Sequence, residues 1–169
     1  MASTIDDLYT TGLANAHALE NQAVQMLSRQ AERLENYPEL AQRMREHIEE
    51  SRRHAARLDE ILRARGSAPS ALKDVGQSII GSLAAMTHAA AQDEVLKNSF
   101  ANYAFEHYEI AAYRSLLVLA DAVGDAWGMK LLRESLAEEE RMAQWIADHL
   151  EPTTRTYMRL AATGQKAGV

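Results

Sequence analysis

The sequence predicts an all-α protein folded as an antiparallel four-helix bundle, in which one long crossover joins two helical hairpins. The 169 residues include only 3 prolines and 8 glycines, which favours helix over loop. Apolar residues recur at helical spacing through four long segments, and no segment alternates apolar and polar residues as a strand would. A chain of this length forms one domain with a proper core. We assign residues 1–150 to the bundle and 151–169 to a partly ordered tail.

The first two long segments are separated by a recognisable break. The first runs from about Ile5 to Glu35, and Asn36-Tyr37-Pro38 follows it. Proline suits the first turn of a helix, so the second helix is expected to begin at Pro38 and to run to about Arg65. The run Gly66-Ser67-Ala68-Pro69-Ser70 then stops it.

The second pair of helices follows a long connection. We expect a short helix at 71–87 inside this crossover, then a third long helix from about 93 to 123. Asp125 is positioned to cap the fourth helix, which is predicted to end at about Leu150, ahead of Pro152. Short turns make antiparallel neighbours, and a single long crossover between two hairpins is the ferritin-like variant of the four-helix bundle.

Each long helix places a carboxylate at or beside its apolar seam, near the middle of its length. In the third helix two of them stand in the otherwise core-like stretch FEHYEIAAY (105–113), and in the second either Ser51 or its neighbour continues the seam. A buried carboxylate is costly unless a cation or a hydrogen-bond network meets it. The candidates are Glu20, Glu50, Glu106, Glu109 and Glu139.

An internal repetition supports the same cluster independently. Glu20 and Glu50 are 30 residues apart, and so are Glu109 and Glu139 (50 − 20 and 139 − 109). Antiparallel helices joined by similar turns put each pair at one level, so two packed hairpins bring the four carboxylates together. They cannot all stay ionised in a dry core without cations.

The sequence therefore indicates a site for two metal ions. There is no cysteine, so any metal must be held by carboxylate and imidazole, a donor set that suits iron or manganese, with zinc as a further option. His54 is the favoured imidazole ligand, and His47, His17 and Tyr113 are further candidates for the ligand set or its surroundings. The simpler alternative is that the glutamates reach solvent at the edge of the core, while the histidines and tyrosines only fill it.

Charge and composition limit the kinds of partner that we expect for this protein. The formal charge of −6 argues against nucleic acid and anionic membranes. The start of the chain lacks the pattern of a signal peptide, and no apolar run is long enough to span a bilayer, so we expect a cytoplasmic protein. The third helix is apolar on several faces, which predicts a homodimer.

The sequence resembles the YciF-like branch of the ferritin-like superfamily, a group of bacterial stress-associated proteins, over about residues 5 to 150. The motifs that carry the resemblance are ALENQ (18–22), HIEES (47–51), FEHYEIAAY (105–113) and LAEEE (136–140). It implies a helical bundle, often dimeric, with a two-metal carboxylate centre. It does not imply a particular reaction.

Two departures from the wider pattern bear on the metal. The usual Glu-x-x-His is absent, and the reverse order stands at His17 to Glu20 and at His47 to Glu50. Many relatives carry an aspartate where this chain has Ala143. Either one metal is weakly held, or Glu106 supplies the missing ligand, or metal binding is lost.

Three functions follow from these features. The leading hypothesis is a non-haem di-iron protein that oxidises iron(II) or reduces dioxygen or peroxide with an unknown redox partner, with Glu50 and Glu139 as bridging ligands. The alternatives are metal sequestration without turnover, and a purely structural helical dimer whose carboxylates form a polar network.

Overall fold

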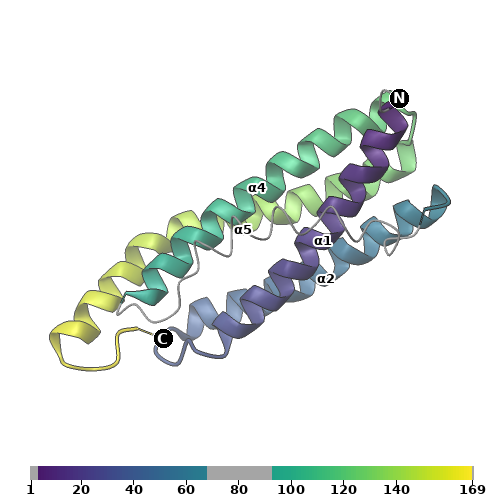
Figure 1. Cartoon of the computed structure of the whole chain (residues 1–169). Coiled ribbons are helices and arrows are strands. Elements are labelled where there is room, and N and C mark those ends of the chain that lie inside the picture. The colour runs from purple at the N-terminus through teal and green to yellow at the C-terminus, as the bar shows by residue number, and fades with distance from the viewer. Residues whose placement is uncertain (1–3, 68–92, 169) are drawn as a thin grey trace.

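The computed structural model describes residues 4–67 and 93–168, and within them it contains four helices and no strand (Figure 1). The helices are α1 (Ile5–Ala31), α2 (Pro38–Ala64), α4 (Glu94–Ala122) and α5 (Ala126–Ala162). The predicted all-α four-helix bundle is confirmed. The predicted short helix at 71–87 lies outside the described residues.

Three helix starts follow from residues that satisfy or omit backbone N–H groups. The Thr4 hydroxyl accepts from the Asp7 backbone, and the Asp7 carboxylate accepts from the Thr4 backbone, which makes a capping box at the start of α1. Pro38 opens α2, where its missing N–H costs nothing. The predicted cap at Asp125 is confirmed, because its Oδ1 accepts from Gly128 N at 2.7 Å.

The four helices form two hairpins that pack side by side. The main contacts are α1 with α2 and α4 with α5, and the hairpins meet through α1 with α4 and α2 with α5. The start of α4 packs at the level of the turn between α1 and α2, whereas α2 ends at the opposite end of the bundle. Helix α4 therefore begins at the end of the bundle opposite to the end of α2, as the ferritin-like topology requires (Figure 1).

The apolar core consists of two main clusters, one towards each end of the bundle. One cluster surrounds the turn between α1 and α2, and the other surrounds the turn between α4 and α5. The first contains Leu27, Ala31, Leu34, Tyr37, Leu40, Ala41, Met44, Ile48, Val95, Leu160 and Ala167. The second contains Tyr9, Leu13, Ala16, Leu58, Ile61, Leu62, Tyr113, Leu116, Ala120 and Leu132. Between them, at mid-length, lie several buried polar side chains, beside a small third cluster of Leu19, Ala23 and Phe105.

The predicted end of the fourth helix at Leu150 is wrong, because α5 continues through Pro152 to Ala162. Proline removes the hydrogen bond to the carbonyl four residues earlier. Both Pro152 and Asp148, whose carbonyl loses its partner, are exposed, so water can satisfy that carbonyl. Burial of Leu160 against the first cluster holds the added turns in place.

The end of the described chain packs back onto the bundle. Gly164, with φ +69°, reverses the chain after α5. Asn36 Nδ2 then donates to Lys166 O at 2.8 Å, and the Tyr37 hydroxyl donates to Ala167 O at 2.6 Å. These contacts fix the C-terminal segment beside the turn between α1 and α2.

Candidate metal centre

Six buried side chains form the polar layer between the two apolar clusters, and all four helices contribute to it. None of the six is more than 1% exposed. The contributions are Glu20 from α1, His47 and His54 from α2, Glu106 and Glu109 from α4, and Glu139 from α5.

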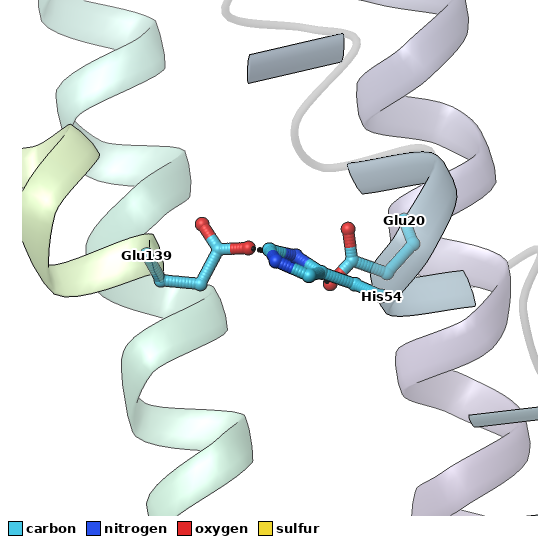
Figure 2. A group of neighbouring side chains, drawn as sticks. All are labelled: Glu20, His54 and Glu139. Atoms are coloured by element: carbon cyan, nitrogen blue, oxygen red, sulfur yellow. Dashed lines mark ion pairs between the residues drawn. The ribbon is translucent and has the colours of Figure 1, made fainter. Parts of the chain in front are cut away.

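One group in this layer is formed by Glu20, His54 and Glu139, with the imidazole between the two carboxylates (Figure 2). The Nδ1 atom of His54 lies 2.7 Å from Glu139 Oε1 and 3.3 Å from Glu20 Oε1. The ligand atoms of the three residues all lie within 4.8 Å of one another, so a single cation could contact all three.

A second group is formed by His47, Glu106 and Glu139. Here the Nε2 atom of His47 lies 3.2 Å from Glu106 Oε2 and 3.6 Å from Glu139 Oε2. Glu139 belongs to both groups and faces each histidine with a different oxygen. Its position is that of a carboxylate shared between two neighbouring cation sites.

The layer contains many buried polar atoms that lack a hydrogen-bond partner. Both oxygens of Glu109 and both of Glu139 are in this state. So are Glu20 Oε2, Glu106 Oε2, His47 Nε2 and His54 Nδ1. Buried polar atoms in native proteins are almost always satisfied. Their convergence here, from six residues, is the pattern expected when cations complete the site.

The electrostatics of the layer point the same way. Burial, and then the charges of Glu139, Glu20 and Glu106, raise the pKa of Glu109 well above its usual range. Burial lowers the pKa of His54, but the close Glu139 and Glu20 carboxylates outweigh it and raise the pKa to about 10. The layer on its own therefore favours bound protons.

Cations can take the place of those protons. Four ionised carboxylates carry −4 between them, and two divalent cations carry +4, with both imidazoles neutral and free to coordinate. The donor set consists of carboxylate oxygen and imidazole nitrogen, which suits iron, manganese or zinc. The residues of the layer thus fit a two-metal centre in charge, donor type and unsatisfied atoms.

Glu50 does not lie in either group. Its Oε2 accepts from His47 Nδ1 at 2.8 Å and from Arg43 Nη2 at 3.0 Å. Burial raises its pKa, but these hydrogen bonds outweigh it and lower the pKa to about 2. Of the two alternatives that the sequence left open for the seam of α2, Ser51 is the buried one and Glu50 stands beside it. Glu50 therefore lies behind His47, outside the two groups, and its bridging role stays a prediction.

Glu138 has the same relation to His54, and the sequence analysis missed it. Its Oε2 accepts from His54 Nε2 at 2.7 Å and from Arg57 Nη1 at 2.6 Å. Sequence reasoning treated LAEEE as the source of one inward glutamate, Glu139. Helical spacing could not have found it, because consecutive residues point about 100° apart and the sequence does not say which neighbour of Glu139 faces α2.

The two remaining candidates behave differently. The Tyr113 hydroxyl donates to Glu20 Oε1 at 2.5 Å and is fully buried, so it orients that carboxylate. His17 lies outside both groups, and its nearest polar partner is Asn21, whose Nδ2 is 3.4 Å from His17 Nδ1. Ala143 is buried one turn after Glu139 and leaves α5 with one carboxylate in the layer.

The fold and the layer define a class of protein: an all-α bundle of ferritin-like topology with a buried carboxylate and histidine centre that could hold metal ions. The chain belongs to the family described as "Domain of unknown function (DUF892)", whose sequence profile matches residues 4–159. The expected relation to the YciF-like branch of the ferritin-like superfamily is confirmed.

Individual relatives agree with this assignment. Protein YciF of Escherichia coli K12 is 28% identical over 141 residues, which is 81% of this chain and 84% of that protein. A crystal structure of a Xanthomonas campestris protein, 28% identical, superposes with a TM-score of 0.78 over 94% of this chain and 99% of the other. The crystal structure of the E. coli stress protein YciF gives a TM-score of 0.77 at 24% identity, over 88% of this chain and 96% of that one.

Among the described residues, no helix combines the length and apolar character needed to cross a bilayer.

Proposed function

We propose that the chain is a non-haem two-metal protein, with iron as its natural metal, that acts on dioxygen or peroxide during bacterial stress. The observation that carries this proposal is the position of Glu139, shared between two groups that each add one imidazole and one further carboxylate. The stress context comes from the E. coli relative, which is described as a stress protein.

The ligands can be assigned from the two groups. Glu20 and His54 would hold one ion, His47 and Glu106 the other, and Glu139 would contact both. Glu106 then supplies the carboxylate that Ala143 cannot, which favours one of the three outcomes left open by the sequence. If iron(II) is held there, it would supply electrons for the reduction of dioxygen or peroxide.

Glu109 is the sixth member of the proposed ligand set. Neither of its oxygens has a hydrogen-bond partner, and the charges of Glu20, Glu106 and Glu139 all act on it. Glu109 belongs to neither group of three residues, so its contact with the ions is part of the proposal. We assign Glu109, rather than Glu50, as the second bridging candidate beside Glu139.

The protein's own contribution is positioning and exclusion of water. The two apolar clusters close the layer from both ends of the bundle. The Tyr113 hydroxyl holds Glu20 in one orientation by donating its proton to Glu20 Oε1, a proposed ligand oxygen, at an oxygen–oxygen distance of 2.5 Å. A preorganised and dry site strengthens every electrostatic interaction within it.

Anaerobic titration with iron(II) tests this function. The expected result is saturation at two ions per chain, followed by an absorption change when dioxygen or hydrogen peroxide is admitted. Many ions per chain would instead indicate storage, and two ions with no reaction towards either oxidant would indicate sequestration. Failure to bind iron(II) at all would remove the proposal.

A structural role without metal is the second candidate, and one observation favours it. His54 Nδ1 is already 2.7 Å from Glu139 Oε1, so protons shared between imidazoles and carboxylates can partly satisfy the layer. In that case a chelator leaves the melting temperature unchanged. Under the two-metal proposal, iron(II) or manganese(II) raises it by mass action.

We also propose that the chain forms a homodimer through α4. Large apolar side chains remain exposed on this helix, with Phe100 55%, Tyr108 42% and Val118 70% accessible. A second subunit would cover part of that surface. Sedimentation at micromolar concentration is expected to give the mass of two chains, and a mass of one chain contradicts the proposal.

A further inference from the structure

The two histidines of the layer are held in the same way from behind. His47 Nδ1 lies 2.8 Å from Glu50 Oε2, and Arg43 Nη2 donates to that same oxygen at 3.0 Å. His54 Nε2 lies 2.7 Å from Glu138 Oε2, and Arg57 Nη1 donates to that same oxygen at 2.6 Å. Each imidazole is thus backed by a glutamate, and each glutamate by an arginine.

These two triads determine which ring nitrogen faces the centre. A glutamate held by arginine is ionised and only accepts, so the imidazole nitrogen beside it must carry the proton and donate. The lone pair of a neutral imidazole then lies on the other nitrogen. That nitrogen is Nε2 in His47 and Nδ1 in His54.

Helix geometry explains why the two rings differ. His47 and His54 are seven residues apart, two turns on one face of α2, and their ring centroids are 6.4 Å apart. Side chains on a helix tilt towards its N-terminus. His54 therefore leans towards the level between the two histidines and presents its near nitrogen, whereas His47 leans away and reaches that level with its far nitrogen.

We infer that Glu50 and Glu138 are matched positioning residues that fix opposite imidazole tautomers, so that the two metal positions are chemically inequivalent, one with Nδ1 and one with Nε2 ligation. This inference rests on the proposed two-metal function. It assigns a role to Glu138, which the sequence did not single out, and replaces ligation by Glu50 with orientation of His47. Outer partners of this kind typically change metal affinity by about 10–100-fold.

The test uses the full chain with 15N-labelled histidine, loaded with zinc(II) as a diamagnetic stand-in. Long-range 1H–15N correlation spectra distinguish Nδ1 from Nε2 ligation. Of the 6 histidines, two are expected to coordinate zinc, one through each nitrogen. Two coordinated histidines that both use Nε2 would overturn the inference while leaving the two-metal function intact. No bound zinc would overturn both.

Variants separate positioning from folding. Glu138→Ala is expected to weaken one of the two zinc-binding steps about 10–100-fold and to disturb only the Nδ1-ligated ring, and Glu50→Ala to do the same for the other step and ring. Glu138→Gln keeps an acceptor oxygen, so it should keep Nδ1 ligation even if the alanine variant fails to fold. Two results would contradict the assignment. One is Nδ1 ligation that is unchanged in Glu138→Ala, and the other is a disturbance of both coordinated rings in each alanine variant.

The chain offers matched controls for both triads. Arg57 also lies 3.6 Å from Glu134, and Arg43 lies 3.9 Å from Glu46, and both of these glutamates are exposed. Neither glutamate takes part in the ion pairs of His47 and His54. Glu134→Ala and Glu46→Ala should therefore leave both zinc-binding steps and both ring signatures unchanged, and an effect as large as that of Glu138→Ala or Glu50→Ala would refute the inference.

Discussion

Helices α2 and α5 are the second helices of their hairpins, yet they bring opposite chemistry to the same layer. The layer receives two imidazoles from α2, and Arg43 and Arg57 stand behind them. From α5 it receives the shared carboxylate of Glu139 and, beside it, Glu138. The 30-residue spacing of Glu20 to Glu50 and of Glu109 to Glu139 predicts that α2 and α5 contribute side chains at the same level of the bundle. It does not make the side chains that they contribute equivalent.

This difference explains how one helix serves two cation positions. Two imidazoles seven residues apart lie above and below a common level on α2, so each faces a different group. A single carboxylate on α5 lies at that level and faces both. In the proposed two-metal centre, two neutral donors would come from one helix and charged donors from the other three.

Removing Glu139 is expected to have the largest effect, because both groups depend on it. Glu139→Ala should abolish binding of both ions in an anaerobic iron(II) titration. Glu140→Ala is the control, since its side chain is exposed and pairs with Arg114 at 2.7 Å. Retention of two ions by Glu139→Ala would show that the shared position is an accident of packing.

Removing one imidazole should affect one position only. His54→Ala and His47→Ala are each expected to reduce the stoichiometry from two ions to one, because each histidine belongs to a single group. His17→Ala should keep both ions, since this residue lies outside both groups. Loss of both ions in either variant would mean that the positions are not separable.

Glu109→Gln should separate metal binding from stability. The amide cannot ionise, so it removes the cost of protonating the Glu109 carboxyl among three other carboxylates, and the metal-free protein is expected to melt higher by roughly 2–4 °C, the shift of about 1 kcal/mol. Metal affinity should fall in the same variant. A metal-free protein that melts lower than the parent would show that Glu109 is already satisfied by other groups.

As pH rises, the melting temperature of the metal-free protein should fall, and the increase in melting temperature caused by metal should become larger. The pKa of His54 is raised from 6.5 to about 10 on folding, so its contribution to stability is complete below pH 6.5 and is lost as pH rises towards 10. The metal-free protein should melt lower at pH 9 than at pH 6.5. Bound metal replaces the protons, so the gain in melting temperature on adding manganese(II) should grow over that range.

Tyr113→Phe should give the smallest effect. It removes the hydrogen bond to Glu20 Oε1 and leaves all six buried ligand candidates in place. A roughly 3–10-fold loss in one of the two binding steps is expected, the effect of a typical hydrogen bond worth about 1 kcal/mol. An equal loss in both steps would place the tyrosine's influence outside the Glu20 group.

The sequence predicted most of the fold, because its helix starts depend on local residues. Pro38 and Asp125 mark the starts of α2 and α5 by chemistry that acts within one turn. The end of α5 depends instead on tertiary packing. Burial of Leu160 against residues more than a hundred positions earlier outweighs the local effect of Pro152, and no local pattern carries that information.

The candidate site was predictable in outline but not in its geometry. Helical spacing predicted that Glu20 and Glu139 face the core, and their burial agrees with it. The same spacing could not decide between Glu50 and Ser51, which differ by one residue on the seam. It also gave no reason to place Glu138 behind His54, because that contact joins two helices and depends on their relative rotation.

X-ray diffraction from a crystal equilibrated with iron(II), measured on both sides of the iron absorption edge, would show directly whether the polar layer holds two metal ions. Two anomalous peaks are expected between the apolar clusters, one beside His54 Nδ1 and Glu20, the other beside His47 Nε2 and Glu106, with Glu139 touching both. A single peak, peaks confined to the protein surface, or no peak would contradict it.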